Sequence, residues 1–211
     1  MDNGGILSRL RSRIYRILAT AFSPPKSEME NIYSDLLHTH STLRPTETSL
    51  EEPSPEDSNL ATLKKEYLRL FVGPGHVLCP PYEAVHRKDR PKFERGLVMG
   101  PSTADVQQAY LEAGLNLAET YTDLPDHIAA EMEFMHFLCA EETKLATQGN
   151  NQESTKMRRI QREFHKNHIE PWVGDFADCI LHSTTSPFYR VTANVLKAFA
   201  KSDADYLTEA E

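Results

Sequence analysis

The chain has 211 residues and a mass of 24.0 kDa, enough for one domain with a continuous apolar core and short for two. Hydrophobic residues make up 39% and charged residues 26%, and the mean hydropathy is -0.52, so we expect a soluble globular chain rather than a disordered or membrane-spanning one. The formal net charge of -8 disfavours nucleic acid and anionic lipid as partners and favours a cationic peptide.

Cysteine usage and the first residues bear on the compartment. Cys79, Cys139 and Cys179 are odd in number, far apart and in no CxxC arrangement, so the sequence predicts neither a disulfide framework nor a zinc site and favours a reducing compartment. Arginines interrupt the apolar positions near the start of the chain, which is typical of a first helix and not of a cleaved secretory signal. We therefore expect a cytoplasmic protein.

Apolar residues at three- and four-residue steps predict a first helix over residues 6–22. Its expected buried stripe is Leu7, Leu10, Ile14, Ile17, Leu18 and Ala21, with Arg9, Arg13 and Arg16 on the opposite side. A second helix is expected over 26–43. Residues 44–57 hold three prolines, five acidic residues and one Leu, which predicts a mobile acidic linker.

The middle of the chain alternates between helices and one long loop. A third helix is expected from Ser58 or Asn59 to Gly73. Residues 72–101 are rich in proline and glycine, too long for an ordinary connection, and are expected to form an ordered functional loop. A fourth helix should follow from about 102 to 114.

The second half of the chain predicts four more helices. Pro125 suits the first turn of a fifth helix that runs to about Gly149, and a sixth helix is expected over 152–168. Pro171 forces a break before a seventh and an eighth helix, whose apolar residues lie in 172–181 and 188–199. The fold class is therefore all-α: one domain over 1–211, a bundle of about eight helices with a long Pro/Gly-rich loop after the third.

Motifs for nucleotide binding or a serine nucleophile are absent from the sequence. A metal site has to be weighed, because Glu83 with His86 and Glu133 with His136 have the spacing found in di-metal carboxylate bundles. That enzyme is the alternative function; the prolines around the first pair favour solvated side chains, no metal and no cofactor. His127 with Glu131 is interpreted as an ion pair, and 165–168 as a surface histidine cluster.

The more distinctive constellation combines the string GPGHVLCPPYEAV with the string DLPDHIAAEMEFMHFL. Asp126 and His127 are expected in the first turn of the fifth helix, with Glu131 one turn beyond on the same side. These residues fit a helix start that only stabilises itself. They also fit an acidic and apolar surface for an arginine-containing peptide, whose guanidiniums pair with carboxylates.

These residues resemble the TorD/DmsD/NarJ family of redox-enzyme maturation chaperones. The resemblance rests on three blocks: Tyr67, Leu70, Phe71, Gly73 and Pro74 with Pro80, Pro81, Tyr82 and Glu83; then Pro125, Asp126, His127, Ile128 and Glu131; and the segment FHKNHIEPWVGDF. It covers most of the chain from about residue 60 to 199. The resemblance implies an all-helical cytoplasmic chaperone, not an enzyme, with no cofactor of its own.

The resemblance also implies the partner. Such a chaperone binds the twin-arginine signal peptide of a molybdenum-cofactor oxidoreductase and assists cofactor loading of the apo subunit before export. Nucleic acid and stable membrane insertion are not expected, and a homodimer is left open. The expected peptide-binding residues carried over from the family motifs are Pro125, Asp126, His127, Tyr82 and Glu83, and helical side and proximity add Glu131, Phe71 and Pro81. We expect the two segments to face each other across an acidic-edged apolar cleft.

Overall fold

The computed structural model describes residues 3–27, 29–43 and 59–209, and this part of the chain holds nine α-helices. Their bounds are α1 (Asn3–Ala21), α2 (Met29–Leu43), α3 (Leu60–Tyr67), α4 (Glu83–His86), α5 (Pro101–Glu112), α6 (Ile128–Thr147), α7 (Asn151–Phe164), α8 (Val173–Ser183) and α9 (Pro187–Glu209). The all-α prediction is confirmed. The helix beyond the expected eight is the single turn α4, which lies inside the 72–101 loop.

Two wider π-helical turns continue helices past their α-helical ends. Leu68–Val72 extends α3, and His165–Ile169 extends α7 towards α8. Gly73 ends the first of these turns with φ 103°, a backbone conformation that favours glycine, and its N–H donates to the Leu68 carbonyl. The expected linker 44–57 lies outside the described residues.

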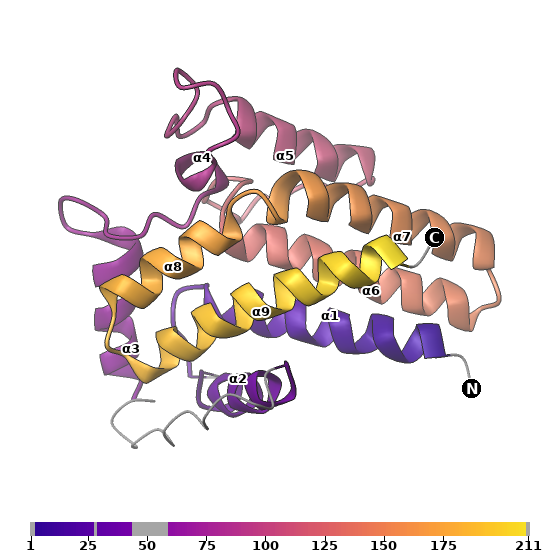
Figure 1. The fold of residues 1–211 in the computed structure, drawn as a ribbon, viewed down its shortest axis with the longest axis horizontal. Helices are drawn as coiled ribbons and strands as arrows, with labels where there is room; N and C mark the ends of the chain where they lie inside the picture. The colour runs from indigo at the N-terminus through magenta and orange to yellow at the C-terminus, as the bar shows by residue number, and fades with distance from the viewer. Residues whose placement is uncertain (1–2, 28, 44–58, 210–211) are drawn as a thin grey trace.

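Four long helices form the centre of the bundle. Figure 1 shows α1, α6, α7 and α9 running along the long axis, with α4 and α5 at the top edge and α2 seen end-on below. The most extensive packing is between α1 and α6, followed by α6 with α7 and α8 with α9. Because α6 lies between α1 and α7, its buried residues join both halves of the sequence.

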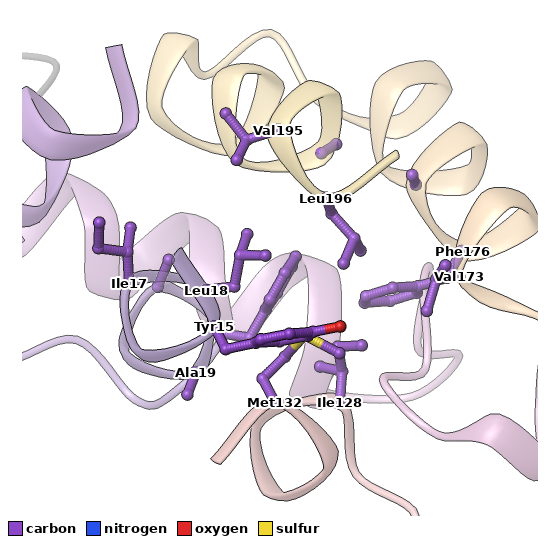
Figure 2. Packing of buried hydrophobic residues seen from close by; sticks show 14 of the residues in the cluster. Tyr15, Ile17, Leu18, Ala19, Ile128, Met132, Val173, Phe176, Val195 and Leu196 are labelled. Carbon is purple, nitrogen blue, oxygen red and sulfur yellow. The ribbon is translucent and has the colours of Figure 1, made fainter. Parts of the chain in front are cut away.

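The core is built from the apolar faces that helical periodicity predicts. Figure 2 shows Leu18 of α1, Met132 of α6, Phe176 of α8 and Leu196 of α9 converging on one volume, and all four are at most 1% exposed. Burial of each such side chain stabilises the fold by roughly 1.5–3 kcal/mol before the entropy of ordering is counted. This continuous core fixes the position of the α6 N-terminus, where the expected site lies.

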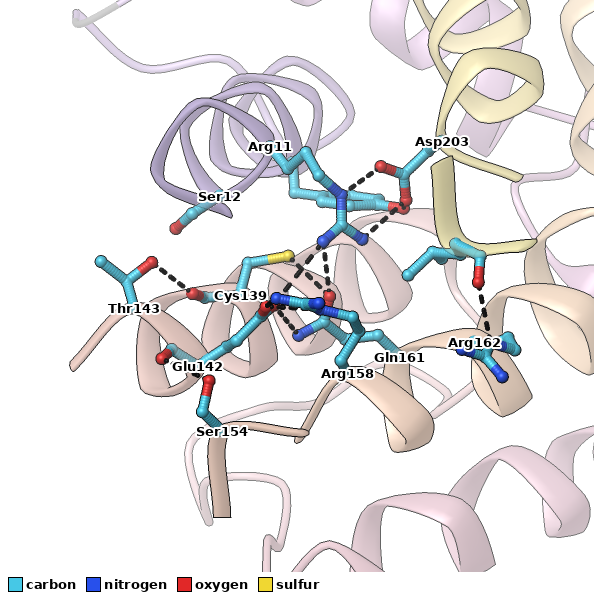
Figure 3. A network of polar contacts seen from close by, with 12 residues as sticks. Arg11, Ser12, Cys139, Glu142, Thr143, Ser154, Arg158, Gln161, Arg162 and Asp203 are labelled. Carbon is cyan, nitrogen blue, oxygen red and sulfur yellow. Dashed lines mark hydrogen bonds and ion pairs between the residues drawn. The ribbon is translucent and has the colours of Figure 1, made fainter. Parts of the chain in front are cut away.

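The first two turns of α1 bury a different face from the one predicted. Leu7 and Leu10 are 43% and 52% exposed, whereas Ser8, Arg11 and Ser12 are buried. The prediction was wrong because Arg11 finds ionic partners on three other helices: Asp203 on α9, Gln161 on α7 and Glu142 on α6. Figure 3 shows its guanidinium at the centre of this network. A charged side chain whose hydrogen bonds are satisfied can replace an apolar one at a helix seam.

The cysteines also differ from the prediction. Cys79 and Cys179 form a disulfide between the loop before Pro80 and α8, with their Cα atoms 5.9 Å apart. Their separation of 100 residues made the pair invisible in the sequence, since spacing along a chain does not report distance in the fold. Cys139 is free and buried. The expectation of no disulfide is therefore corrected.

Membrane insertion was tested on the helices. Within the described ranges, every helix is too short or too polar to cross a bilayer.

Candidate functional site

The two segments that define the expected site pair with each other. The Glu83 N–H donates to the Asp126 carbonyl at 3.0 Å, and the Ile128 N–H donates to the Pro81 carbonyl at 2.9 Å, which forms an isolated antiparallel bridge between Tyr82 and His127. The Tyr82 and His127 rings meet edge to face with centroids 5.4 Å apart. The loop and the start of α6 therefore lie side by side, as predicted.

The acidic residues of these segments converge below this pairing. Glu83 accepts from the Arg87 Nη1 at 2.5 Å and lies 3.0 Å from the Nδ1 of His168. Asp126 accepts from the Ala84 N–H at 3.2 Å, and Glu131 accepts from the Trp172 Nε1 at 3.2 Å. We call Glu83, Asp126 and Glu131 the buried acid cluster.

The buried acid cluster is closed to solvent. Each of its three carboxyl groups belongs to a residue with 0% exposure, and His127 is 4% exposed. Burial raises the pKa of Glu131 well above its ordinary range, and the negative charges of Glu83 and Asp126 raise it further. Burial likewise raises the pKa of Asp126, partly offset by the Ala84 N–H. Glu131 is therefore held protonated at neutral pH.

The structure thus places the eight predicted residues together without the open acidic edge that was expected. Pro81 and the acid cluster are buried, and Phe71 lies in the aromatic core, 5.5 Å from the ring of Tyr189. Only Tyr82 and Pro125 are half-exposed. The expected cleft between the segments is replaced by direct packing, because the carboxyl groups satisfy each other and the backbone.

The start of α6 is one turn later than predicted. The helix begins at Ile128, and His127 is its N-cap, accepting from the Ala129 N–H at its Nδ1. The expected ion pair with Glu131 is replaced by a contact of 3.9 Å between His127 Nε2 and Asp123 Oδ2. Burial lowers the pKa of His127, and Asp123 opposes this shift. A neutral imidazole can accept the capping hydrogen bond.

Two groups in the cluster were missed as site residues. His168 and Trp172 come from the segment FHKNHIEPWVGDF, the third block of the family resemblance, so all three blocks meet at the acid cluster. His165 and His168 are 2% and 8% exposed, which corrects the expected surface histidine cluster. Arg87 was hidden in the basic string after His86, and its i,i+4 spacing from Glu83 was the signal that could have found it.

The residues of the di-metal alternative have separate partners. His86 lies 2.8 Å from the Pro80 carbonyl oxygen, and His136 lies 2.8 Å from the Ser12 hydroxyl oxygen on α1. Glu83 belongs to the acid cluster, whereas Glu133 is exposed. Among the described residues, no three His, Cys, Asp or Glu side chains lie close enough together to hold a metal ion.

An open groove lies beside the paired segments. It has a volume of about 560 Å³ and is bounded by the end of α1, the first turns of α6 and the loop between α5 and α6. Most of its lining is apolar, including Leu115, Leu117, Ala129, Phe134 and Phe137, and its charged lining residues are Lys26 and Glu133. We call this opening the α6 groove.

The paired segments hold one wall of the α6 groove. Tyr110, which lines the groove, donates its hydroxyl hydrogen to the Pro125 carbonyl at 2.9 Å. Tyr121, another lining residue, donates to the Leu124 carbonyl at 3.3 Å. The turn before His127 therefore fixes the loop that shapes the groove, and the acid cluster fixes that turn.

The acid cluster predicts a pH dependence of stability. Because the folded state holds the proton of Glu131 above its ordinary pKa of 4.5, the contribution to the free energy of unfolding is complete below about pH 4.5. It is lost as the pH rises towards the folded-state pKa. Glu131→Gln keeps an oxygen for Trp172 and removes this titration, so the variant should gain stability relative to wild type as the pH rises from 4.5 to 8.5.

Urea unfolding at several pH values measures this difference. His127 and His165, whose pKa values are lowered by burial, act with the opposite sign below about pH 6.5, and their contributions cancel in the comparison with wild type. Glu133→Gln, two residues away on the exposed side of α6, should stay within about 0.5 kcal/mol of wild type throughout. A constant difference between Glu131→Gln and wild type would contradict a protonated Glu131.

Comparison with known proteins identifies relatives. Residues 26–178, more than half of the chain, match the family described as nitrate reductase delta subunit. The chain is 24% identical to the chaperone protein TorD of Shewanella pealeana over 72% of its length, and 29% identical to the selenate reductase assembly chaperone protein of Thauera selenatis over 63% of its length. Each alignment spans 63% of the relative.

A solved structure, titled as a putative redox enzyme maturation protein from Archaeoglobus fulgidus, is similar with a TM-score of 0.47 and 21% identity over 94% of both chains. The relatives are named as chaperones or assembly proteins and not as enzymes. The chain belongs to the nitrate reductase delta subunit family, the TorD- and NarJ-type maturation chaperones of redox enzymes.

Proposed function

We propose that this protein binds the twin-arginine signal peptide of a molybdenum-cofactor reductase subunit. It acts in the cytoplasm, on the apo subunit, and keeps that subunit from export until its cofactor is in place. The relatives named for TorD and for selenate reductase assembly support a reductase as the client.

The observation that carries this proposal is the α6 groove. Its lining is mostly apolar, its volume of about 560 Å³ can receive several side chains, and it opens directly beside the turn that carries the family motif. A signal peptide of this class offers an apolar segment that would aggregate if left exposed, together with two guanidiniums. An apolar groove on an acidic protein matches both properties.

The eight motif residues have two roles in this proposal. Tyr82 and Pro125 remain partly accessible and can contact the peptide next to the groove. Asp126, His127 and the rest act from behind, because their hydrogen bonds hold the turn on which Tyr110 and the groove wall depend. Substitution of Asp126 should therefore weaken binding by altering the wall.

Calorimetric titration with synthetic signal peptides from the twin-arginine oxidoreductases of the same organism tests the proposal. We expect at least one peptide to bind with a micromolar dissociation constant, equivalent to about 8 kcal/mol. Affinity should fall with added salt, because the net charge of -8 attracts the guanidiniums.

The matched control is the same peptide with both arginines replaced by alanine. Its affinity should fall at least tenfold if the guanidiniums are recognised. Absence of binding to every peptide, or equal binding of the arginine and alanine forms, would rule out twin-arginine recognition.

A further inference from the structure

A second opening lies on the other side of α5, between α5 and α7. It has a volume of about 290 Å³. Its floor is apolar, from Ala109, Ala113, Phe134, Ile160 and Phe164. We call it the α5–α7 pocket.

The polar lining of the α5–α7 pocket is acidic. Three carboxylates line it, from Asp105 and Glu112 on α5 and Glu163 on α7, and no Lys or Arg is among its described lining residues. Asp105 already pairs with Arg90, and Glu163 has only a long contact of 3.9 Å with Arg159. Glu112 accepts a neutral hydrogen bond from Gln108. Glu112 and Glu163 therefore keep most of their negative charge for a ligand.

The two openings adjoin at the C-terminal end of α5. Phe134 lines both of them, and the neighbouring residues Ala113 and Leu115 line one each. Gly114 lies between these two with φ 78°, and an added Cβ there would meet nothing within 4 Å. An extended chain can therefore cross over Gly114 from the acidic pocket into the apolar groove.

We propose that the client peptide lies across this end of α5, with arginine in the α5–α7 pocket and its apolar segment in the α6 groove. This inference rests on the proposed function and assigns its binding surface. The occupant follows from complementarity: a carboxylate-edged pocket with an apolar floor fits a guanidinium and its methylene stem, and the adjoining apolar groove fits leucine-type side chains. A cationic pocket ligand without an apolar extension would leave the groove empty.

The test uses the whole protein and the signal peptide that binds tightest in the calorimetric titration, labelled with fluorescein. Glu112→Gln combined with Glu163→Gln should weaken binding of the arginine peptide about tenfold and leave binding of its alanine form unchanged within twofold. Glu141→Gln combined with Glu153→Gln is the matched control, because it changes the net charge equally at exposed or half-exposed positions outside both openings. This control should stay within about threefold of wild type.

The groove half of the proposal has its own variant. Ala118 is exposed and lines the α6 groove, so Ala118→Trp fills the groove with little risk to folding. It should weaken both the arginine and alanine peptides, at least tenfold for the former. Thermal melting by circular dichroism verifies that each variant is folded.

The outcomes separate this inference from the proposed function. If no peptide binds the wild type, both fail. If peptides bind with arginine dependence but the Glu112/Glu163 double variant equals its control, or Ala118→Trp binds normally, the proposed function stands and this surface is wrong. A wild-type dimer in sedimentation that Ala118→Trp dissociates would assign the groove to a second copy of the chain and would also overturn the inference.

Discussion

Arg11→Met is expected to lower the free energy of unfolding by about 3–5 kcal/mol, because it leaves buried carboxylates without their cation. Arg11 is 5% exposed, and its Nη2 donates to Asp203 at 3.0 Å while its Nη1 donates to Gln161 at 2.7 Å. Tyr15 also donates to Asp203, at 2.6 Å. Figure 3 shows that this network joins α1, α6, α7 and α9, so its loss affects the whole centre of the bundle.

The charge of Arg11 is maintained by its surroundings. Burial alone would lower the pKa of its guanidinium, but the hydrogen bond and charge of Asp203 outweigh burial and raise that pKa. Urea unfolding followed by circular dichroism measures the loss of stability. Arg13→Met is the matched control on the same helix, since the Arg13 side chain is 61% exposed and pairs with Asp35 at the surface. Its effect should be below about 1 kcal/mol. Equal effects of the two variants would contradict a buried ionic network.

Reduction of the disulfide between Cys79 and Cys179 is expected to cost about 2–4 kcal/mol of stability, because opening the bond frees a loop of roughly 100 residues in the unfolded chain. The measurement is urea unfolding of the wild type with and without a thiol reductant. The bond also fixes the segment that leads into Pro80 and Tyr82 against α8, so its loss should loosen the partner strand of His127.

The control for reduction is the double variant Cys79→Ala with Cys179→Ala. It should resemble the reduced wild type, and added reductant should not change it. Cys139 is buried, and burial raises the pKa of its thiol to about 12, so it does not exchange readily with the pair. Identical unfolding of the wild type with and without reductant would contradict a structural role for the bond.

The sequence predicts the helices well where apolar periodicity alone decides them. The face of α6 that carries Ile128, Met132 and Met135 is buried as expected, and the core of α8 and α9 follows the same rule. The rule fails at the start of α1, where Arg11 is buried by an ion pair with Asp203, 192 residues further along the chain. No local pattern contains that partner, and a tertiary contact then decides which face is inside.

The site shows the same division. Motif order correctly predicted that Tyr82 and His127 would meet, but helical spacing treated Asp126 and Glu131 as surface carboxylates. Their burial depends on Trp172, His168 and Arg87, which converge only in the fold. The α6 groove could not be predicted for a similar reason, since its walls come from four separate stretches of the chain.

The central claim is that a client signal peptide binds beside the family motif, in the openings at the end of α5. Hydrogen–deuterium exchange of the whole protein with and without the tightest-binding peptide tests it most directly. We predict slower exchange of backbone amides at residues 111–121 and in the first turns of α6, with no change in the outer turns of α2 and α9. Protection confined to α2, α8 or α9, with residues 111–121 unchanged, would contradict the account.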